Sequence, residues 1–263
     1  MTPLASALLL LAAAQPIEDV DVAVPDEEGQ ARGELTGSFE ASLANATGNT
    51  ENLNVGLAGE VNYEHGRYTH NLNAAANYAE SGEAGGGTRE TTQQNVFVAY
   101  ELDVAVSDRG FAFGRARYER DEFSGFLQRI FLGGGYGYRV FETDALNWKL
   151  TGGPGVRFVE VEDPVPDPLT GEVPEGGGWM TDFSVYAASE FEWDVRENVG
   201  LEHDATVTYT GPNTTFETEL ALKTRLTELL SARMSYFVRH ETAPPLEREP
   251  TDTLLRAGIV VDF

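Results

Sequence analysis

The chain has 263 residues, enough for one large all-β domain, and its 43 acidic residues against 18 basic ones give a formal net charge of -25. A surplus of this size would repel phosphate, which excludes a nucleic-acid-binding protein. The absence of cysteine excludes a disulfide framework and a thiolate metal site.

The first apolar run extends from Leu4 to Ala14, with four consecutive leucines at its centre. A membrane-spanning helix needs about 20 apolar residues, so this run is too short to be one. It resembles the apolar region and small-residue cleavage site of a secretory signal, although no Lys or Arg precedes it. We therefore expect a signal peptide over residues 1–14, a flexible acidic periplasmic lead-in over 15–33 and one barrel domain over 34–263.

From residue 34 onward, apolar and polar side chains alternate in segments separated by turn residues, which is the pattern of β-strands. In one of the clearest segments, Phe183 and Val185 share one face while Ser184 lies on the other. The predicted strands span 34–47, 53–65, 67–80, 92–106, 110–121, 127–141, 147–161, 179–195, 199–210, 214–226, 230–241 and 252–263. Most are long enough for the roughly nine to eleven residues that a tilted strand needs to cross a membrane.

The lengths of the connections fit an outer-membrane barrel, which has short periplasmic turns and longer outer loops. Alternate connections, such as those near residues 64–67 and 196–198, are short, and the longest connections, near 81–90, 162–178 and 242–250, all belong to the other set. An even number of strands places both ends of the barrel on one side. We therefore expect a Gram-negative outer-membrane location with both termini in the periplasm.

Charged residues occupy the polar face of most strands, while the apolar face is rich in Ala, Gly, Val and Leu. A soluble twelve-strand barrel would need bulkier residues to fill its interior, whereas a barrel in lipid can hold water or ion pairs inside. We therefore expect an antiparallel up-and-down transmembrane β-barrel rather than a soluble sandwich or a lipocalin-like carrier. The candidate lumen-lining residues are Arg115, Arg117, Arg129, Arg139, Lys149, Arg157, Arg225, Arg233, Arg239, Arg256, Glu190, Glu192, Glu202, Glu217 and Glu219.

The alternation of apolar and polar residues is weak in one predicted strand, 110–121, and clear in the last one, 252–263. In the segment 110–121, Phe111 and Phe113 share a face with Arg115 and Arg117, so its alternation is weak. The last segment alternates clearly and ends on Phe263, as the final strands of outer-membrane barrels do. We expect this residue to be the signal read by the barrel-assembly machinery, and outer-membrane lipid and lipopolysaccharide to be the other partners.

Several short strings resemble the DUF481 family, the YdiY-like group of salt-induced outer-membrane proteins. They are ATGNT at 46–50, YERDEFSGFLQR at 118–129, GGGYGY at 133–138 and GGPGVRF at 152–158. The resemblance implies a small outer-membrane barrel and carries over no catalytic residue. The glycines in these strings also have a structural interpretation, because they make room for large neighbouring side chains or bend the barrel.

Three functions follow from these observations. The first is a structural or osmotic-stress role, in which lumen Arg and Lys pair with carboxylates and largely plug the barrel. The alternative is a narrow channel for small or acidic solutes, such as acidic oligosaccharides. A third, an outer-membrane lipid hydrolase, has His240 as its only candidate residue, because none of the four histidines begins a His-x-Ser string.

The sequence predicts no enzyme activity, cofactor or dedicated metal site. Acidic residues gather around the longest loop, at Glu160, Glu162, Asp163, Asp167, Glu172 and Glu175. They lack the spacing of a calcium-binding loop, although they leave open a weak association with divalent cations or lipopolysaccharide.

Overall fold

The computed structural model describes residues 33–46, 50–83, 89–121, 126–161, 177–244 and 249–263. The predicted signal peptide and, except for Gly33, the predicted acidic lead-in lie outside the described residues. The same holds for the turn at 47–49, for residues 122–125 and for most of the acidic loop, at 162–176. Among the residues that are described, no helix is long and apolar enough to cross a membrane.

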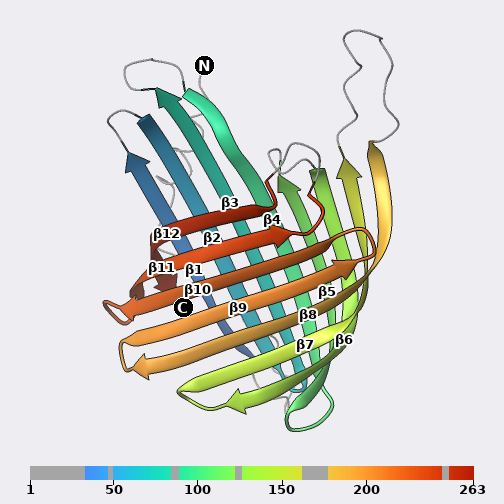
Figure 1. Ribbon diagram of the computed structural model, residues 1–263. Helices are drawn as coiled ribbons and strands as arrows, with labels where there is room; N and C mark the ends of the chain where they lie inside the picture. Colours follow the sequence, from blue (N-terminus) through green and yellow to red (C-terminus); the bar gives the residue numbers. More distant parts are fainter. Residues whose placement is uncertain (1–32, 47–49, 84–88, 122–125, 162–176, 245–248) are drawn as a thin grey trace. The chain divides into compact units, whose positions relative to one another are not determined.

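Twelve antiparallel strands form a closed barrel in which each strand pairs with its neighbours in the chain and the last pairs with the first. They are β1 (Glu34–Ala46), β2 (Thr50–His65), β3 (Tyr68–Glu83), β4 (Arg89–Ala105), β5 (Gly110–Asp121), β6 (Phe126–Glu142), β7 (Leu146–Val161), β8 (Gly178–Arg196), β9 (Val199–Thr210), β10 (Thr214–Arg225), β11 (Leu230–Glu241) and β12 (Thr251–Asp262). The predicted twelve-strand barrel is confirmed, and every strand end lies within three residues of its predicted position. In Figure 1, β9 to β12 pass in front of β2 to β4 and cross them, as strands tilted to the barrel axis do.

The two rims of the barrel differ in the length of chain that connects the strands. One rim, here called the short-turn rim, carries connections of two to four residues at 66–67, 106–109, 143–145, 197–198 and 226–229. Gly66 has a φ of 62°, a left-handed conformation that glycine adopts without strain, so it suits the two-residue turn between β2 and β3. The opposite, long-loop rim carries the connections at 84–88, 162–177 and 242–250.

The barrel closes across a short seam. β1 and β12 pair only over Ser38–Ser42 and Gly258–Asp262, whereas every other pair of neighbouring strands is in register over eleven residues or more. Phe263 extends the seam, because its backbone N–H donates to the Gly37 carbonyl at 2.9 Å and its carbonyl accepts from the Gly37 N–H at 2.8 Å. The final residue of the chain therefore takes part in closure.

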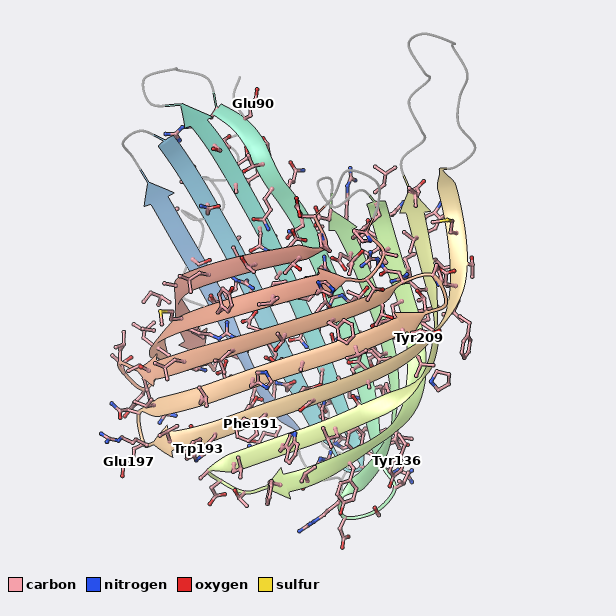
Figure 2. All side chains as sticks on the ribbon, viewed as in Figure 1. Glu90, Tyr136, Phe191, Trp193, Glu197 and Tyr209 are labelled. Carbon is pink, nitrogen blue, oxygen red and sulfur yellow. The ribbon has the colours of Figure 1, made fainter. Side chains whose placement is uncertain are left out.

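Apolar side chains cover the outside of the barrel. Leu43, Phe183 and Leu255 expose 69%, 68% and 67% of their surface, and Tyr136 and Tyr209 point outward in Figure 2. Charged residues such as Glu101 and Arg157 are buried instead. A soluble protein has the opposite arrangement, whereas a barrel in lipid needs an apolar outer band and satisfies its backbone hydrogen bonds by closure.

The weakly patterned strand β5 turns its phenylalanines into the lumen. Phe111 is fully buried and packs in an aromatic cluster with Phe113, Phe131, Tyr186 and Ala188. The glycines of β6 and β7 make this possible, as expected from the sequence. A Cβ on Gly137 would collide with the Phe111 ring, and one on Gly155 would collide with the Phe131 ring.

Candidate functional site: the barrel lumen

A cavity of about 1350 Å³ lies inside the barrel. Its lining includes Thr36 and Glu228 near the short-turn rim, and Gln93 and Asp252 near the long-loop rim. Residues from both ends of the strands therefore border one continuous space.

Most of the candidate lumen-lining residues border this cavity. They are Arg115, Arg117, Lys149, Arg225, Arg233, Arg239, Arg256, Glu190, Glu192, Glu202, Glu217 and Glu219. Arg129 and Arg157 border a second, much smaller cavity of about 40 Å³. Arg139 lines neither cavity; its guanidinium lies 5.0 Å from the centre of the Phe111 ring and its Nε lies 3.5 Å from Glu142.

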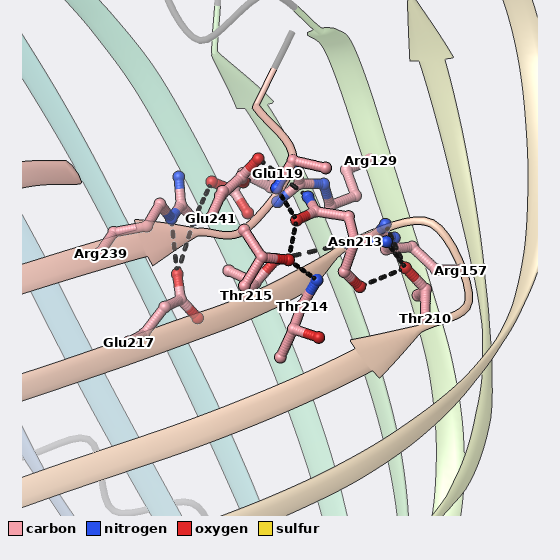
Figure 3. A network of polar contacts seen from close by, with 12 residues as sticks. Glu119, Arg129, Arg157, Thr210, Asn213, Thr214, Thr215, Glu217, Arg239 and Glu241 are labelled. Carbon is pink, nitrogen blue, oxygen red and sulfur yellow. Dashed lines mark hydrogen bonds and ion pairs between the residues drawn. The ribbon is translucent and has the colours of Figure 1, made fainter. Parts of the chain in front are cut away.

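A cross-lumen network joins opposite walls of the barrel near the long-loop rim (Figure 3). Arg239 on β11 donates to Glu217 on β10 at 2.6 Å and to Glu119 on β5, half the circumference away. Beside this pair, Arg129 on β6 donates to Glu241 on β11 at 3.1 Å. These contacts fill the lumen between β5 to β7 and β9 to β11 at this level.

The network continues through Arg157 on β7, which is 5% exposed. Its Nη2 donates to the Thr210 hydroxyl at 2.9 Å and lies 3.9 Å from Asp182. The Thr210 hydroxyl in turn donates to the carbonyl of Asn213, in the turn between β9 and β10. The arginine thus ties β7 to this turn.

A second cluster lies nearer the short-turn rim. Lys149 on β7 contacts Glu101 at 3.1 Å and Glu190 at 2.9 Å, and Arg115 contacts Glu101 at 3.0 Å. The Arg115 guanidinium also lies over the Tyr186 ring, 5.3 Å from its centre. With the aromatic cluster, these residues fill the lumen beside β5 to β8.

A third cluster surrounds Arg233 on β11. This side chain contacts Glu40 on β1 at 3.1 Å, Glu202 on β9 at 2.9 Å and Glu219 on β10 at 2.7 Å. The Glu40 side chain crosses β12 at Gly258, where a Cβ would lie 2.9 Å from the Glu40 Oε1 atom. The ion pair therefore links β1 to β11 across the seam.

The wall next to the filled side, formed by β2 to β4, carries few charges. On β2 to β4, the residues lining the cavity include a set of amides: Asn54, Asn62, Asn71, Asn73, Asn77, Gln93 and Asn95. Asn77 on β3 donates to Asn95 on β4 at 2.9 Å, which joins two of these amides across neighbouring strands. Small residues such as Ala75 and Ala99 separate the amides and leave space beside them.

The histidines do not form a hydrolytic arrangement with serine in the described part of the barrel. His240 shares a 2.8 Å hydrogen bond with Thr251 and its ring lies 6.4 Å from that of Phe216. His203 bonds to Thr218, and His70 bonds to Tyr100. Within the same residues, no group of His, Cys, Asp or Glu side chains is arranged to hold a metal ion.

The acidic loop that the sequence singles out is represented by one described residue, Glu160, which accepts a hydrogen bond from Gln128. The sequence reasoning missed two features of the lumen, the aromatic cluster and the amide wall. In the sequence, Asn71, Asn73 and Asn77 alternate with apolar residues and so share the polar face of their strand, and this shared face was the signal for the amide wall.

A match to known proteins covers most of the barrel. The family model described as "Protein of unknown function, DUF481" matches residues 39–263. The uncharacterized protein YdiY of Escherichia coli (strain K12) is 25% identical over 158 residues, and the match spans 60% of this chain and only 57% of that relative.

Two solved structures are similar over nearly their whole length. The NanC porin has a TM-score of 0.49 and 10% identity, covering 87% of this chain and 100% of the porin. The COG4313 outer membrane channel from Pseudomonas putida F1 has a TM-score of 0.49 and 11% identity, covering 91% of this chain and 100% of the channel. With the family model matched along 39–263, the chain belongs to the DUF481 family.

Proposed function

We propose that this protein is an outer-membrane barrel that gives small hydrophilic solutes a narrow passive route across the membrane. The apolar outside, the charged inside and the closed circle of strands support the membrane location. The observation that carries the transport role is the 1350 Å³ cavity, whose lining reaches from one rim to the other.

The passage follows one side of the lumen. The cross-lumen network and the aromatic cluster occupy the space beside β5 to β8, whereas the amide wall of β2 to β4 borders the cavity. Amide side chains both donate and accept hydrogen bonds, so they can replace water around a polar solute. The geometry thus favours small solutes in single file over long chains.

A structural or osmotic-stress role with a plugged lumen is the second candidate. The cross-lumen network favours it, because Arg239 and Glu119 come from strands on opposite walls. In that case the ion pairs would stiffen the barrel and the cavity would hold only trapped water. No enzyme activity is part of either proposal.

The orientation is also part of the proposal. We assign the short-turn rim, with Gly33 and Phe263, to the periplasm and the long-loop rim to the outside, where it would meet lipopolysaccharide. The barrel-assembly machinery would bind the β12 end at Phe263.

Planar-bilayer recording of the folded, purified barrel tests the transport role. Single-channel steps are expected, together with swelling of proteoliposomes in small sugars. In the variant Asn73→Trp an indole replaces an amide that borders the cavity, so the step size should fall. Leu72→Trp is the matched control, because the neighbouring side chain is 44% exposed on the outside of the barrel.

One result would decide against transport, and a second would decide against its route along the amide wall. A folded barrel that shows no steps and no swelling would leave the plugged structural role. Equal steps for Asn73→Trp and Leu72→Trp would mean that current does not follow the amide wall.

A further inference from the structure

An unusual row of carboxylates crosses the lumen wall opposite the amides. The register pairs Glu190 on β8 with Asp204 on β9, and Asp204 with Glu219 on β10. One row further toward the short-turn rim, Glu192 pairs with Glu202. These five residues are here called the acidic band.

Like charges placed directly opposite on neighbouring strands destabilise a sheet, so the band costs the fold stability unless cations offset it. Protein cations do so only in part. Lys149 contacts Glu190, and Arg233 contacts Glu202 and Glu219. Within the described residues, Glu192 and Asp204 have no ion pair. Both side chains line the cavity and are exposed to it.

The basic residues around the cavity already interact with carboxylates or with a backbone carbonyl. The lining holds sixteen acidic and eight basic side chains. Seven of the eight basic ones lie within 4 Å of a carboxylate, as Arg256 does with Glu219 at 3.1 Å and Lys223 with Asp262 at 2.6 Å. The eighth, Arg225, donates to the backbone carbonyl of Glu197 at 3.4 Å. An anion entering the passage would therefore meet few uncompensated positive charges.

We propose that the passage prefers small cations to anions, and that Asp204 and Glu192 supply most of this preference. The inference rests on the proposed passage and names the class of solute that uses it. Water in the cavity screens each carboxylate, but low-dielectric walls concentrate the field of the surplus negative charge inside the lumen.

Among the described residues, no three His, Cys, Asp or Glu side chains are arranged to hold a metal ion. We therefore expect a cation to pass along the band without being retained. Selectivity without tight binding is what conduction requires, because an ion must be able to leave.

The test is the K⁺ to Cl⁻ permeability ratio, measured from the reversal potential of the reconstituted barrel in a KCl gradient. We expect the unmodified chain to favour K⁺ several-fold. The double variant Glu192→Gln/Asp204→Asn should fold, since it removes like-charge repulsion, and should still conduct, with a ratio close to one. The control Asp108→Asn/Asp144→Asn also removes two carboxylates, but from exposed turns of the short-turn rim that do not line the cavity.

The outcomes separate the two proposals. A conducting barrel with no cation preference would overturn the selectivity and leave the passage standing. A cation preference that survives in the double variant, or that the control loses equally, would overturn the role of the acidic band. A folded barrel without conductance would refute the passage, and the selectivity with it.

Discussion

Arg239 is expected to stabilise the barrel more than any exposed arginine, because it holds two carboxylates on opposite walls. Its side chain is 12% exposed, and those of Glu119 and Glu217 are 9% and 17% exposed. Removing one partner of a buried ion pair costs about 3 to 5 kcal/mol, because the other charge stays buried without compensation. Arg117 remains 3.5 to 3.6 Å from both carboxylates, so we place the loss for Arg239→Met at the lower end, about 3 kcal/mol.

Urea unfolding in lipid vesicles, followed by tryptophan fluorescence, measures this loss. The comparison variant is Arg225→Met, whose exposed guanidinium donates to a backbone carbonyl and should contribute less than about 1 kcal/mol. The triple variant Arg239→Met/Glu119→Gln/Glu217→Gln should recover stability relative to Arg239→Met, because no uncompensated charge remains. If Arg239→Met costs no more than Arg225→Met, the cross-lumen network does not stabilise the fold.

Two further predictions concern closure of the barrel. Gly258→Ala should destabilise the barrel by about 1 to 3 kcal/mol, because the new Cβ would lie 2.9 Å from the Ala41 carbonyl oxygen; heat-dependent gel mobility would report an earlier loss of the folded band. Gly200→Ala, whose Cβ would meet nothing closer than 3.5 Å, is the control and should melt like the parent. Deleting Phe263 should lower the amount of protein recovered in the outer membrane, since both backbone bonds to Gly37 are lost, and unchanged recovery would contradict its role in assembly.

The sequence predicts the strands and their faces well because both depend on local alternation. A segment such as β8 reveals in its own residues which side chains point together. The number of strands then follows by counting, and the lengths of the connections identify the two rims.

The contents of the lumen could not be predicted in the same way. Arg233 and Glu40 are 193 residues apart in the chain and meet only because β12 closes the circle against β1. In the sequence, Phe111 shares the polar face of its strand with arginines. Alternation shows which side chains share a face, but it does not show whether that face contacts water or a packed aromatic cluster. Partners across a barrel depend on circumference and register, which no single segment contains.

Because the seam between β1 and β12 is short, the pairing between neighbouring strands is weaker there than elsewhere around the barrel. Opening the wall between two neighbouring strands breaks their backbone hydrogen bonds together, each of which contributes about 1 kcal/mol in water. Between β1 and β12 far fewer residues share these bonds than at the other boundaries. The amides that bond across the seam, such as those of Gly37 and Phe263, should therefore exchange with deuterium earlier than those in the middle of β7 and β8. The first and last strands of the barrel would then be the first to separate.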